Sequence, residues 1–365
     1  MRFERLPAGR VPGLEAAGLD AEPRRGLLPW LVPLEGSPRR WGYLDVESTG
    51  LGPAPGTLVF LVGLAWWEGE ELHLRQHLLL EPALEASWLE RVAADLAGRA
   101  WVTFNGDRFD LPLLAARWLL SHGPGALPNP FAAGEGGSLA AWDLLPAARL
   151  LWGRRLGRAS LAALEEGVLG LRRAGDMPGS AAPARYLAYL NGAGVDLLDD
   201  VAAHNRLDLL ALAALASRAA ALLAAAEPAR LPGWAAEALG RRAHAAGDAA
   251  AAALLRRAFE AAERAGERLR AGRLLARELE RRRRWEEAAR VWEALLDPSP
   301  LAPFEAYVAL AKLYEHRLRS PGRALEVVER ALHAEAARRL PGAALRLEEL
   351  ERRRRRLVRR LGHLG

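Results

Sequence analysis

The 365-residue sequence contains no cysteine and a single lysine, Lys312. Without cysteine, the chain forms no disulfide bond, binds no metal through a thiolate and uses no cysteine nucleophile, so we expect a cytoplasmic protein. No run of 18 uncharged apolar residues is present, and no membrane-spanning helix is predicted. The first residues, MRFERLPAGR, lack the apolar stretch of a secretion signal, so no signal peptide is expected.

Acidic and basic residues are unevenly distributed along the chain. Residues 230–365 contain 30 Lys and Arg against 19 Asp and Glu, a net charge of +11, whereas the preceding residues carry a net charge of −5. A basic segment beside an acidic one is a pattern that enzymes acting on nucleic acids can show. The alternative is that these arginines lie on solvent-exposed helix faces and bind nothing.

Hydrophobic patterns predict an irregular N-terminal extension over residues 1–40 and an α/β domain over residues 41–228. The extension is rich in proline, glycine and arginine and shows little periodicity. The domain begins with three strands, a helix, a strand and a helix, an order that indicates a mixed sheet with antiparallel members. We predict strands at 41–48, 57–67, 71–80 and 100–106, and helices at 85–98, 110–121, 143–152, 160–169, 183–191 and 195–226.

Residues 229–365 are predicted to be entirely helical and to repeat weakly. The small residues Ala251, Ala288 and Ala324 follow the start of alternate predicted helices and are spaced by 37 and 36 residues. This period is near the ~34 residues of tetratricopeptide repeats, in which a small residue lets paired helices approach. An unrelated helical bundle is the alternative for this domain.

Asp45 and Glu47 lie two residues apart on the first predicted strand of the α/β domain. Side chains at alternate positions of a strand share a face, so the two carboxylates should converge at the end of a core strand. Like charges repel there unless a cation lies between them, and Mg²⁺ and Mn²⁺ prefer oxygen ligands. Taken alone, the motif also fits ordinary surface carboxylates at a strand end.

The segment FNGDRFD, residues 104–110, places Asp110 at the start of a predicted helix, after a glycine turn. We expect Phe109 and Leu111 to pack and Asp107 to be a turn residue. Asp110 either faces a cleft or caps the helix, and one carboxylate can do both.

The segment HNRLD, residues 204–208, lies on the last predicted helix of the α/β domain. His204 and Asp208 are four residues apart and therefore share one helix face. Asp208 could bind a metal ion there, with His204 one turn earlier and nearer to solvent. A local hydrogen bond between the two side chains is the alternative.

In this order, the three motifs resemble those of the four-acidic-residue exonucleases of the ribonuclease H-like superfamily. Residues 41–226 further resemble the YprB-type predicted exonuclease family in the segments WDLLPAARLLW (142–152), SLAALEEGVLG (160–170), DMPGSAAPARYLAYL (176–190) and HNRLDLLALAAL (204–215). The resemblance implies a ribonuclease H-like α/β fold followed by tetratricopeptide-like repeats. It also implies a 3′–5′ exonuclease that acts on DNA or RNA, at a single strand or an exposed 3′ end.

By this resemblance, Asp45 bridges two Mg²⁺ or Mn²⁺ ions, Glu47 and Asp208 hold the first ion, and Asp110 holds the second. Two such ions stabilise the attacking water and the leaving oxygen of a phosphodiester. His204 would orient or deprotonate that water. Three residues separate His204 from Asp208, as in the tyrosine-type relatives, whereas the histidine-type enzymes have four. Because a helix turns by ~100° per residue, this difference changes where the imidazole lies.

Asn105 matches the asparagine of these exonucleases and would position the scissile strand or the loop. Phe109 is the second candidate for substrate binding, because Phe104, Phe109 and Trp142 could stack on bases, although aromatic side chains are usually found in a core. Two further carboxylates in the family-like segments are helix-cap candidates rather than predicted metal ligands: Asp143 and Asp176.

Two other functions compete with catalysis. The chain could be an adaptor that binds a protein partner through residues 230–365, with a weak or vestigial nuclease domain. A vestigial site would be expected to lack at least one of its four carboxylates, and none is missing. Nucleic-acid binding without chemistry is the other alternative, but the negative charge of the α/β domain argues against it.

Overall fold

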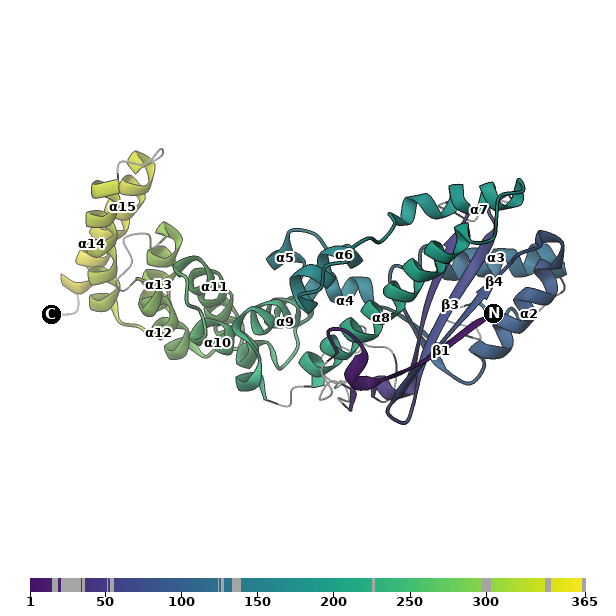
Figure 1. Ribbon diagram of the computed structural model, residues 1–365. Coiled ribbons are helices and arrows are strands. Elements are labelled where there is room, and N and C mark those ends of the chain that lie inside the picture. Colours follow the sequence, from purple (N-terminus) through teal and green to yellow (C-terminus); the bar gives the residue numbers. More distant parts are fainter. Residues whose placement is uncertain are drawn as a thin grey trace. The chain divides into compact units, whose positions relative to one another are not determined.

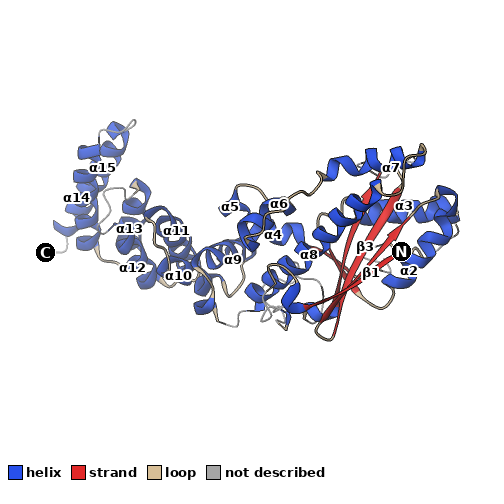
Figure 2. Cartoon of the chain, in the orientation of Figure 1, coloured by secondary structure: helices blue, strands red, loops and turns tan. Residues whose placement is uncertain are grey.

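The computed structural model describes residues 1–14, 19–20, 34, 37–50, 52, 56–123, 125, 128–132, 139–224, 227–296, 303–338 and 343–362. The chain divides into two compact units, Met1–Ala226 and Glu227–Gly365 (Figure 1). A β-sheet and helices form the N-terminal unit, and the described residues of the C-terminal unit form helices and their connections (Figure 2).

Six strands form one mixed sheet in the N-terminal unit, in the order β1-β4-β3-β2-β5-β6. Neighbours from β1 to β2 are antiparallel, whereas β5 is parallel to both β2 and β6. The predicted mixed sheet with antiparallel members is therefore confirmed. The strands are Arg2–Pro7 (β1), Trp41–Ser48 (β2), Val59–Glu68 (β3), Glu71–Leu78 (β4), Ala100–Thr103 (β5) and Ala141–Asp143 (β6).

The predicted irregular extension is wrong at its start, because Arg2–Pro7 forms the edge strand β1, antiparallel to β4. None of its residues is buried, so no alternation of apolar and polar residues marks the strand in the sequence. Strand β6 is also absent from the prediction, since three residues are too few to show a period. Residues 15–18, 21–33 and 35–36 of the predicted extension lie outside the described residues.

Helices cover both faces of the sheet, since every residue of β3 except Glu68 is buried. Helix α8 (Leu197–Ala224) packs on β2 and β3, where Asn205 and Leu209 lie against Gly63. Among the described residues, the other α-helices of this unit are α2 (Glu85–Leu96), α3 (Asp110–His122), α4 (Leu144–Leu151), α5 (Gly153–Leu156), α6 (Leu161–Leu164) and α7 (Ala182–Leu190). Shorter elements are the π-helix η4 (Glu165–Leu169) and the 3₁₀ helices η1 (Ala8–Arg10), η2 (Pro38–Arg40), η3 (Pro82–Leu84) and η5 (Gly179–Ala181).

By length and composition alone, α8 is able to cross a membrane, unlike any other helix in the described part of the chain. Residues 209–217 of this helix are nevertheless all buried inside the N-terminal unit. A helix that is apolar on every side is typical of a protein core as well as of a membrane, and the burial of α8 fits the core.

The C-terminal unit contains helices that each pack on the next along the chain. Ala251, Ala288 and Ala324 are fully buried in alternate helices, as the predicted repeat requires. Whether these pairs are tetratricopeptide repeats remains a prediction. After η6 (Pro228–Arg230), the helices are α9 (Gly233–Ala246), α10 (Ala251–Glu260), α11 (Ala265–Arg281), α12 (Trp285–Leu296), α13 (Phe304–His316), α14 (Pro321–Arg338) and α15 (Ala343–Gly362).

Buried carboxylates bind several arginines of this unit. Glu278 is fully buried and accepts hydrogen bonds from Arg281 and Arg282, at 2.5 Å each. The same arrangement joins α13 to α15 in two further pairs, Arg353–Glu315 and Arg356–Glu315. Part of the positive charge of the unit therefore neutralises its own buried acids, which favours a structural role for these arginines.

Candidate active site

Asp45 and Glu47 lie on β2, a central strand that pairs with β3 on one side and with β5 on the other. Asp45 is opposite Gly63 of β3. Because glycine has no side chain, α8 approaches the sheet closely at this position, and Asn205 occupies the space. Its Nδ2 donates a hydrogen bond of 2.7 Å to Oδ2 of Asp45, which fixes the orientation of that carboxylate.

Asn205 is completely buried and is hydrogen-bonded to a second side-chain amide, that of Gln76. Its Oδ1 accepts a hydrogen bond of 2.9 Å from Nε2 of Gln76, which also donates to the carbonyl of Ala202 at 2.7 Å. The sequence motifs do not point to either amide. A signal exists for Gln76, since it follows Leu72 and Leu74 on one face of β4 and is a polar residue on an otherwise apolar face.

Asp110 begins α3, directly after the loop that follows β5. Oδ1 of Asp143 anchors this loop by accepting the N–H of Asn105 at 2.7 Å, and the same oxygen caps α4 through the N–H of Leu145 at 2.9 Å. Asn105 has a φ of +67°, in the left-handed region that asparagine tolerates better than most residues. The helix-cap prediction for Asp143 is confirmed, whereas Asp110 is a helical residue and not a cap.

His204 and Asp208 lie on one face of α8, with Nε2 of His204 3.6 Å from Oδ2 of Asp208. Nδ1 of His204 lies 3.0 and 2.9 Å from Oδ1 and Oδ2 of Asp176. The helix-cap prediction for Asp176 is wrong, because its carboxylate caps no described helix and binds His204 and Arg173 instead. Burial raises the pKa of Asp176, but hydrogen bonds from Arg173 and His204 outweigh it and leave the pKa below its ordinary value.

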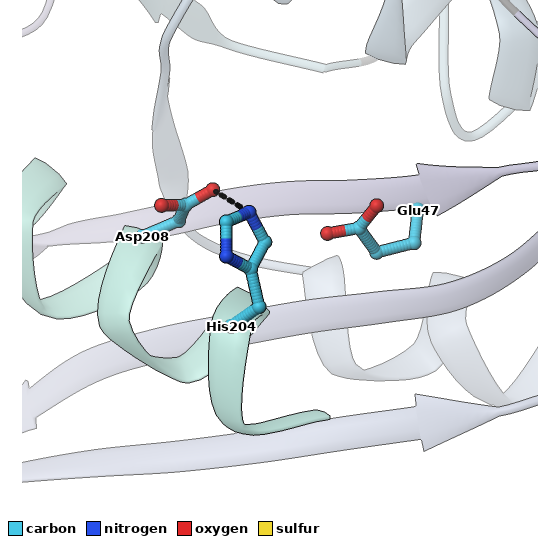
Figure 3. A group of neighbouring side chains, drawn as sticks. All are labelled: Glu47, His204 and Asp208. Carbon is cyan, nitrogen blue, oxygen red and sulfur yellow. Dashed lines mark ion pairs between the residues drawn. The ribbon is translucent and has the colours of Figure 1, made fainter. Parts of the chain in front are cut away.

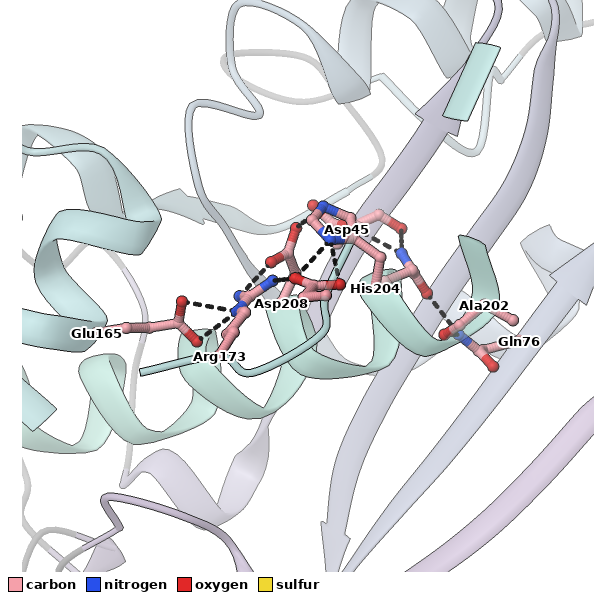
Figure 4. Close-up of polar contacts among 9 residues, drawn as sticks. Asp45, Gln76, Glu165, Arg173, Ala202, His204 and Asp208 are labelled. Carbon is pink, nitrogen blue, oxygen red and sulfur yellow. Dashed lines mark hydrogen bonds and ion pairs between the residues drawn. The ribbon is translucent and has the colours of Figure 1, made fainter. Parts of the chain in front are cut away.

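Arg173 joins three carboxylates at the edge of the site (Figure 4). It donates to Asp208, to Asp176 at 2.9 Å and to Glu165, the first residue of the π-helix η4, at 3.1 Å. Burial lowers the pKa of Arg173, but the charge of Asp208 and these hydrogen bonds raise it above its ordinary value. The sequence does not distinguish this residue, which is one arginine among 50.

The four predicted carboxylates converge and repel one another. Burial raises the pKa of Asp45 well above its ordinary value, and the charges of Asp208, Glu47 and Asp110 raise it further. Burial and neighbouring carboxylates likewise raise the pKa of Glu47 to about 8 and that of Asp110 to about 7. One ligand atom each of Glu47, His204 and Asp208 lies within 4.8 Å of the others (Figure 3). Half-buried carboxylates with an imidazole are a donor set that fits a divalent metal ion.

The aromatic residues differ in their exposure. Trp142 is buried, as expected, and Phe104 is half-buried. The prediction that Phe109 packs is wrong, because its side chain is 41% exposed directly before Asp110. The ring lies in the turn that precedes α3, whereas Leu111 lies on the buried face of that helix. Its exposure leaves Phe109 accessible to a ligand.

The mixed sheet and the acidic group on its central strand define the class of the N-terminal unit. A family model described as RNase_H superfamily matches residues 42–220, which include the four carboxylates and His204. The unit is therefore a nuclease domain of the ribonuclease H-like superfamily, whose members generally use divalent metal ions and act on nucleic acids.

A curated relative extends the match into the C-terminal unit. The chain is 32% identical over 296 residues to "Uncharacterized protein YprB" of Bacillus subtilis (strain 168), an alignment that covers 80% of this chain and 68% of the relative. The chain belongs to the YprB-like family.

Proposed function

We propose that this protein is a 3′–5′ exonuclease that hydrolyses phosphodiester bonds of DNA or RNA with two divalent metal ions. The observation that carries the proposal is the convergence of Asp45, Glu47, Asp110 and Asp208 in one half-buried site. Burial, and then repulsion by the neighbouring carboxylates, raises the pKa values of the first three, and a cation bound among them would offset both effects. Mg²⁺ or Mn²⁺ would remove that repulsion.

The four carboxylates divide the work of holding the ions. Asp45 would contribute to holding both ions, Glu47 and Asp208 would hold the first, and Asp110 would hold the second. When bound, two ions stabilise the charge on the attacking and leaving oxygens of the phosphodiester. Asn205 keeps the Asp45 carboxylate in one orientation, so that little reorganisation is needed when the ions and the substrate bind.

The surroundings of Asp110 supply the contacts for the nucleic acid. Phe109 presents an exposed ring on which a base can stack, and stacking of this kind requires an unpaired base. The loop of Asn105, anchored by Asp143, positions the scissile strand. These features support a single strand or an unpaired 3′ end as the substrate.

Nuclease activity on end-labelled single-stranded DNA and RNA tests the proposal. The whole chain is assayed with Mg²⁺, with Mn²⁺ and with a chelator, and wild type is compared with Asp45→Asn. Asp107→Asn is the matched control, because Asp107 is an exposed carboxylate in the turn before Asp110. We expect stepwise shortening from the 3′ end that requires metal, disappears in Asp45→Asn and persists in Asp107→Asn.

Other outcomes of the assay support other functions. Metal-dependent internal cuts would indicate an endonuclease with the same metal site. No cleavage by the folded protein in any metal would favour the adaptor function, in which the C-terminal unit binds a protein partner and the nuclease domain is vestigial. The presence of all four carboxylates argues against that outcome.

A further inference from the structure

The two ring nitrogens of His204 have different surroundings. Nδ1 is within 3.0 Å of both oxygens of Asp176, which also accepts a hydrogen bond from Arg173. An ionised carboxylate only accepts hydrogen bonds. The proton of a neutral His204 is therefore on Nδ1, and Nε2 carries a lone pair.

Nε2 of His204 faces other acceptors. It lies 3.6 Å from Oδ2 of Asp208, which is beyond hydrogen-bonding distance. Glu47 completes the group, in which one ligand atom each of Glu47, His204 and Asp208 lies within 4.8 Å of the others (Figure 3). Lone pairs that face one another repel unless a proton or a metal ion lies between them. A second proton, on Nε2, would serve one neighbouring oxygen, whereas a metal ion can bind all three atoms at once.

We propose that His204 binds a divalent metal ion through Nε2, together with Glu47 and Asp208, and that Asp176 holds the imidazole in position for it. This inference rests on the proposed metal-dependent function of the same site. It replaces the role of base that the resemblance assigns to His204, because a lone pair bound to a metal ion does not accept a proton.

The spacing of the motif agrees with this assignment. Three residues separate His204 from Asp208, so both side chains project from one helix face and can bind the same ion. Asp176 is a positioning residue, because a carboxylate behind a metal-bound histidine fixes the ring and strengthens the ligand. Imidazole nitrogen suits transition-metal ions better than Mg²⁺, so the site should prefer Mn²⁺.

Pulsed EPR of the Mn²⁺-loaded whole chain tests the assignment directly, since a bound imidazole gives a ¹⁴N coupling. Calorimetric titrations with Mn²⁺ and with Mg²⁺ accompany it. His204→Asn is the informative variant, because its amide can still donate to Asp176 but has no nitrogen at the position of Nε2. His333→Asn is the control, since His333 is an exposed histidine of the C-terminal unit.

We expect a ¹⁴N coupling in wild type and in His333→Asn that is absent in His204→Asn. Mn²⁺ affinity should fall about 10–100-fold in Asp176→Ala, the range for loss of a group that orients a ligand, and at least as much in His204→Asn. Mg²⁺ affinity should fall less. A Mn²⁺-loaded wild type without ¹⁴N coupling, or an unchanged Mn²⁺ affinity in folded His204→Asn, overturns the inference.

Nuclease assays on the same samples separate this inference from the proposed function. Cleavage by wild type without a ¹⁴N coupling would support the proposed nuclease function and exclude His204 as a metal ligand. A ¹⁴N coupling that His204→Asn abolishes, in a protein that cleaves neither DNA nor RNA, would retain the ligand and reject the nuclease.

Discussion

The side-chain amide of Asn205 donates to the carboxylate of Asp45 across 2.7 Å, from a position that is completely buried. Helix α8 and strand β2, which are 160 residues apart along the chain at this contact, are therefore joined at the centre of the acidic site. The carboxylate is held by a neutral donor, which leaves its negative charge available to a metal ion.

Asn205→Ala should lower both stability and metal affinity. The change removes the donor to Asp45 and leaves the amide of Gln76 short of one acceptor, at a cost of about 1–3 kcal/mol for a buried polar group without a partner. Chemical denaturation and Mn²⁺ titration measure the two effects. Asn191→Ala, at the exposed position directly after α7, is the control and should change stability much less. Equal losses in both variants would contradict the role given to Asn205.

Gly63→Ala should displace Asn205. An added Cβ would lie 2.1 Å from Oδ1 of Asn205 and 2.8 Å from a methyl carbon of Leu209, neither of which has room to move in the core. Overpacking of this kind costs about 1–3 kcal/mol, and we expect weaker Mn²⁺ binding as well. Gly153→Ala is the control, because its Cβ would meet no atom closer than 3.9 Å. Unaltered metal binding in folded Gly63→Ala would show that Asp45 does not depend on the amide.

The metal-free protein should lose stability as the pH rises. The pKa values of Glu47, about 8, and Asp110, about 7, are above their ordinary values of 4.5 and 3.8. Groups with raised pKa values stabilise the folded state fully below their unfolded pKa and lose that contribution as the pH rises through the folded value. In chelator, the melting temperature should therefore fall by several degrees between about pH 5 and pH 8, since about 1 kcal/mol corresponds to about 2–4 °C in a unit of this size.

Thermal unfolding followed by circular dichroism measures this dependence. Saturating Mn²⁺ at about pH 8 should restore the melting temperature, because the metal ion stabilises the ionised carboxylates. Glu47→Gln should flatten the pH dependence in chelator, since it removes one of the titrating groups. A profile in chelator that is flat, or that rises toward pH 8, would show that the carboxylates are not held close together.

Asp143→Ala should reduce nuclease activity by more than the loss of a helix cap explains. Removal of the cap of α4 costs about 1 kcal/mol, but the same oxygen also anchors Asn105 in the loop that leads to Asp110. Ser160→Ala is the matched control. It removes the cap of α6, and within the described residues the Ser160 side chain makes no second hydrogen bond to a loop of the site. A similar loss of activity in both variants, assayed where both are folded, would argue against the loop contact.

Sequence patterns predict the central part of this fold well and its edge poorly. The sequence is strongly apolar or periodic in four elements of the centre, namely β2, β3, β4 and α8. These patterns exist because the elements bury side chains in the core. Strand β1 buries no residue. Its position depends on main-chain pairing with β4 and on partly exposed side-chain contacts such as the Glu4–Arg206 ion pair, and neither produces a periodic apolar pattern in the sequence.

The same distinction holds for the site. The order of three short motifs predicts the four carboxylates, because each motif places its acid locally at a strand end, a helix start or a helix face. Asp176 and Arg173 act through partners 28 and 35 residues away, and their neighbours in sequence give no sign of those contacts. For Phe109 the sequence predicts burial, because aromatic residues are usually buried. The residue is exposed because it lies in a short turn.

Helix α8 carries His204, Asn205 and Asp208, and its following residues, 209–217, are all buried in the core. A helix rotates by ~100° and rises by ~1.5 Å per residue. Adding or deleting one residue between these two stretches would turn all three side chains away from β2 while the core remained in place. The rotation of α8 about its axis therefore determines both its hydrophobic packing and the positions of the site residues. In alignments of the family, insertions and deletions should fall outside residues 204–217.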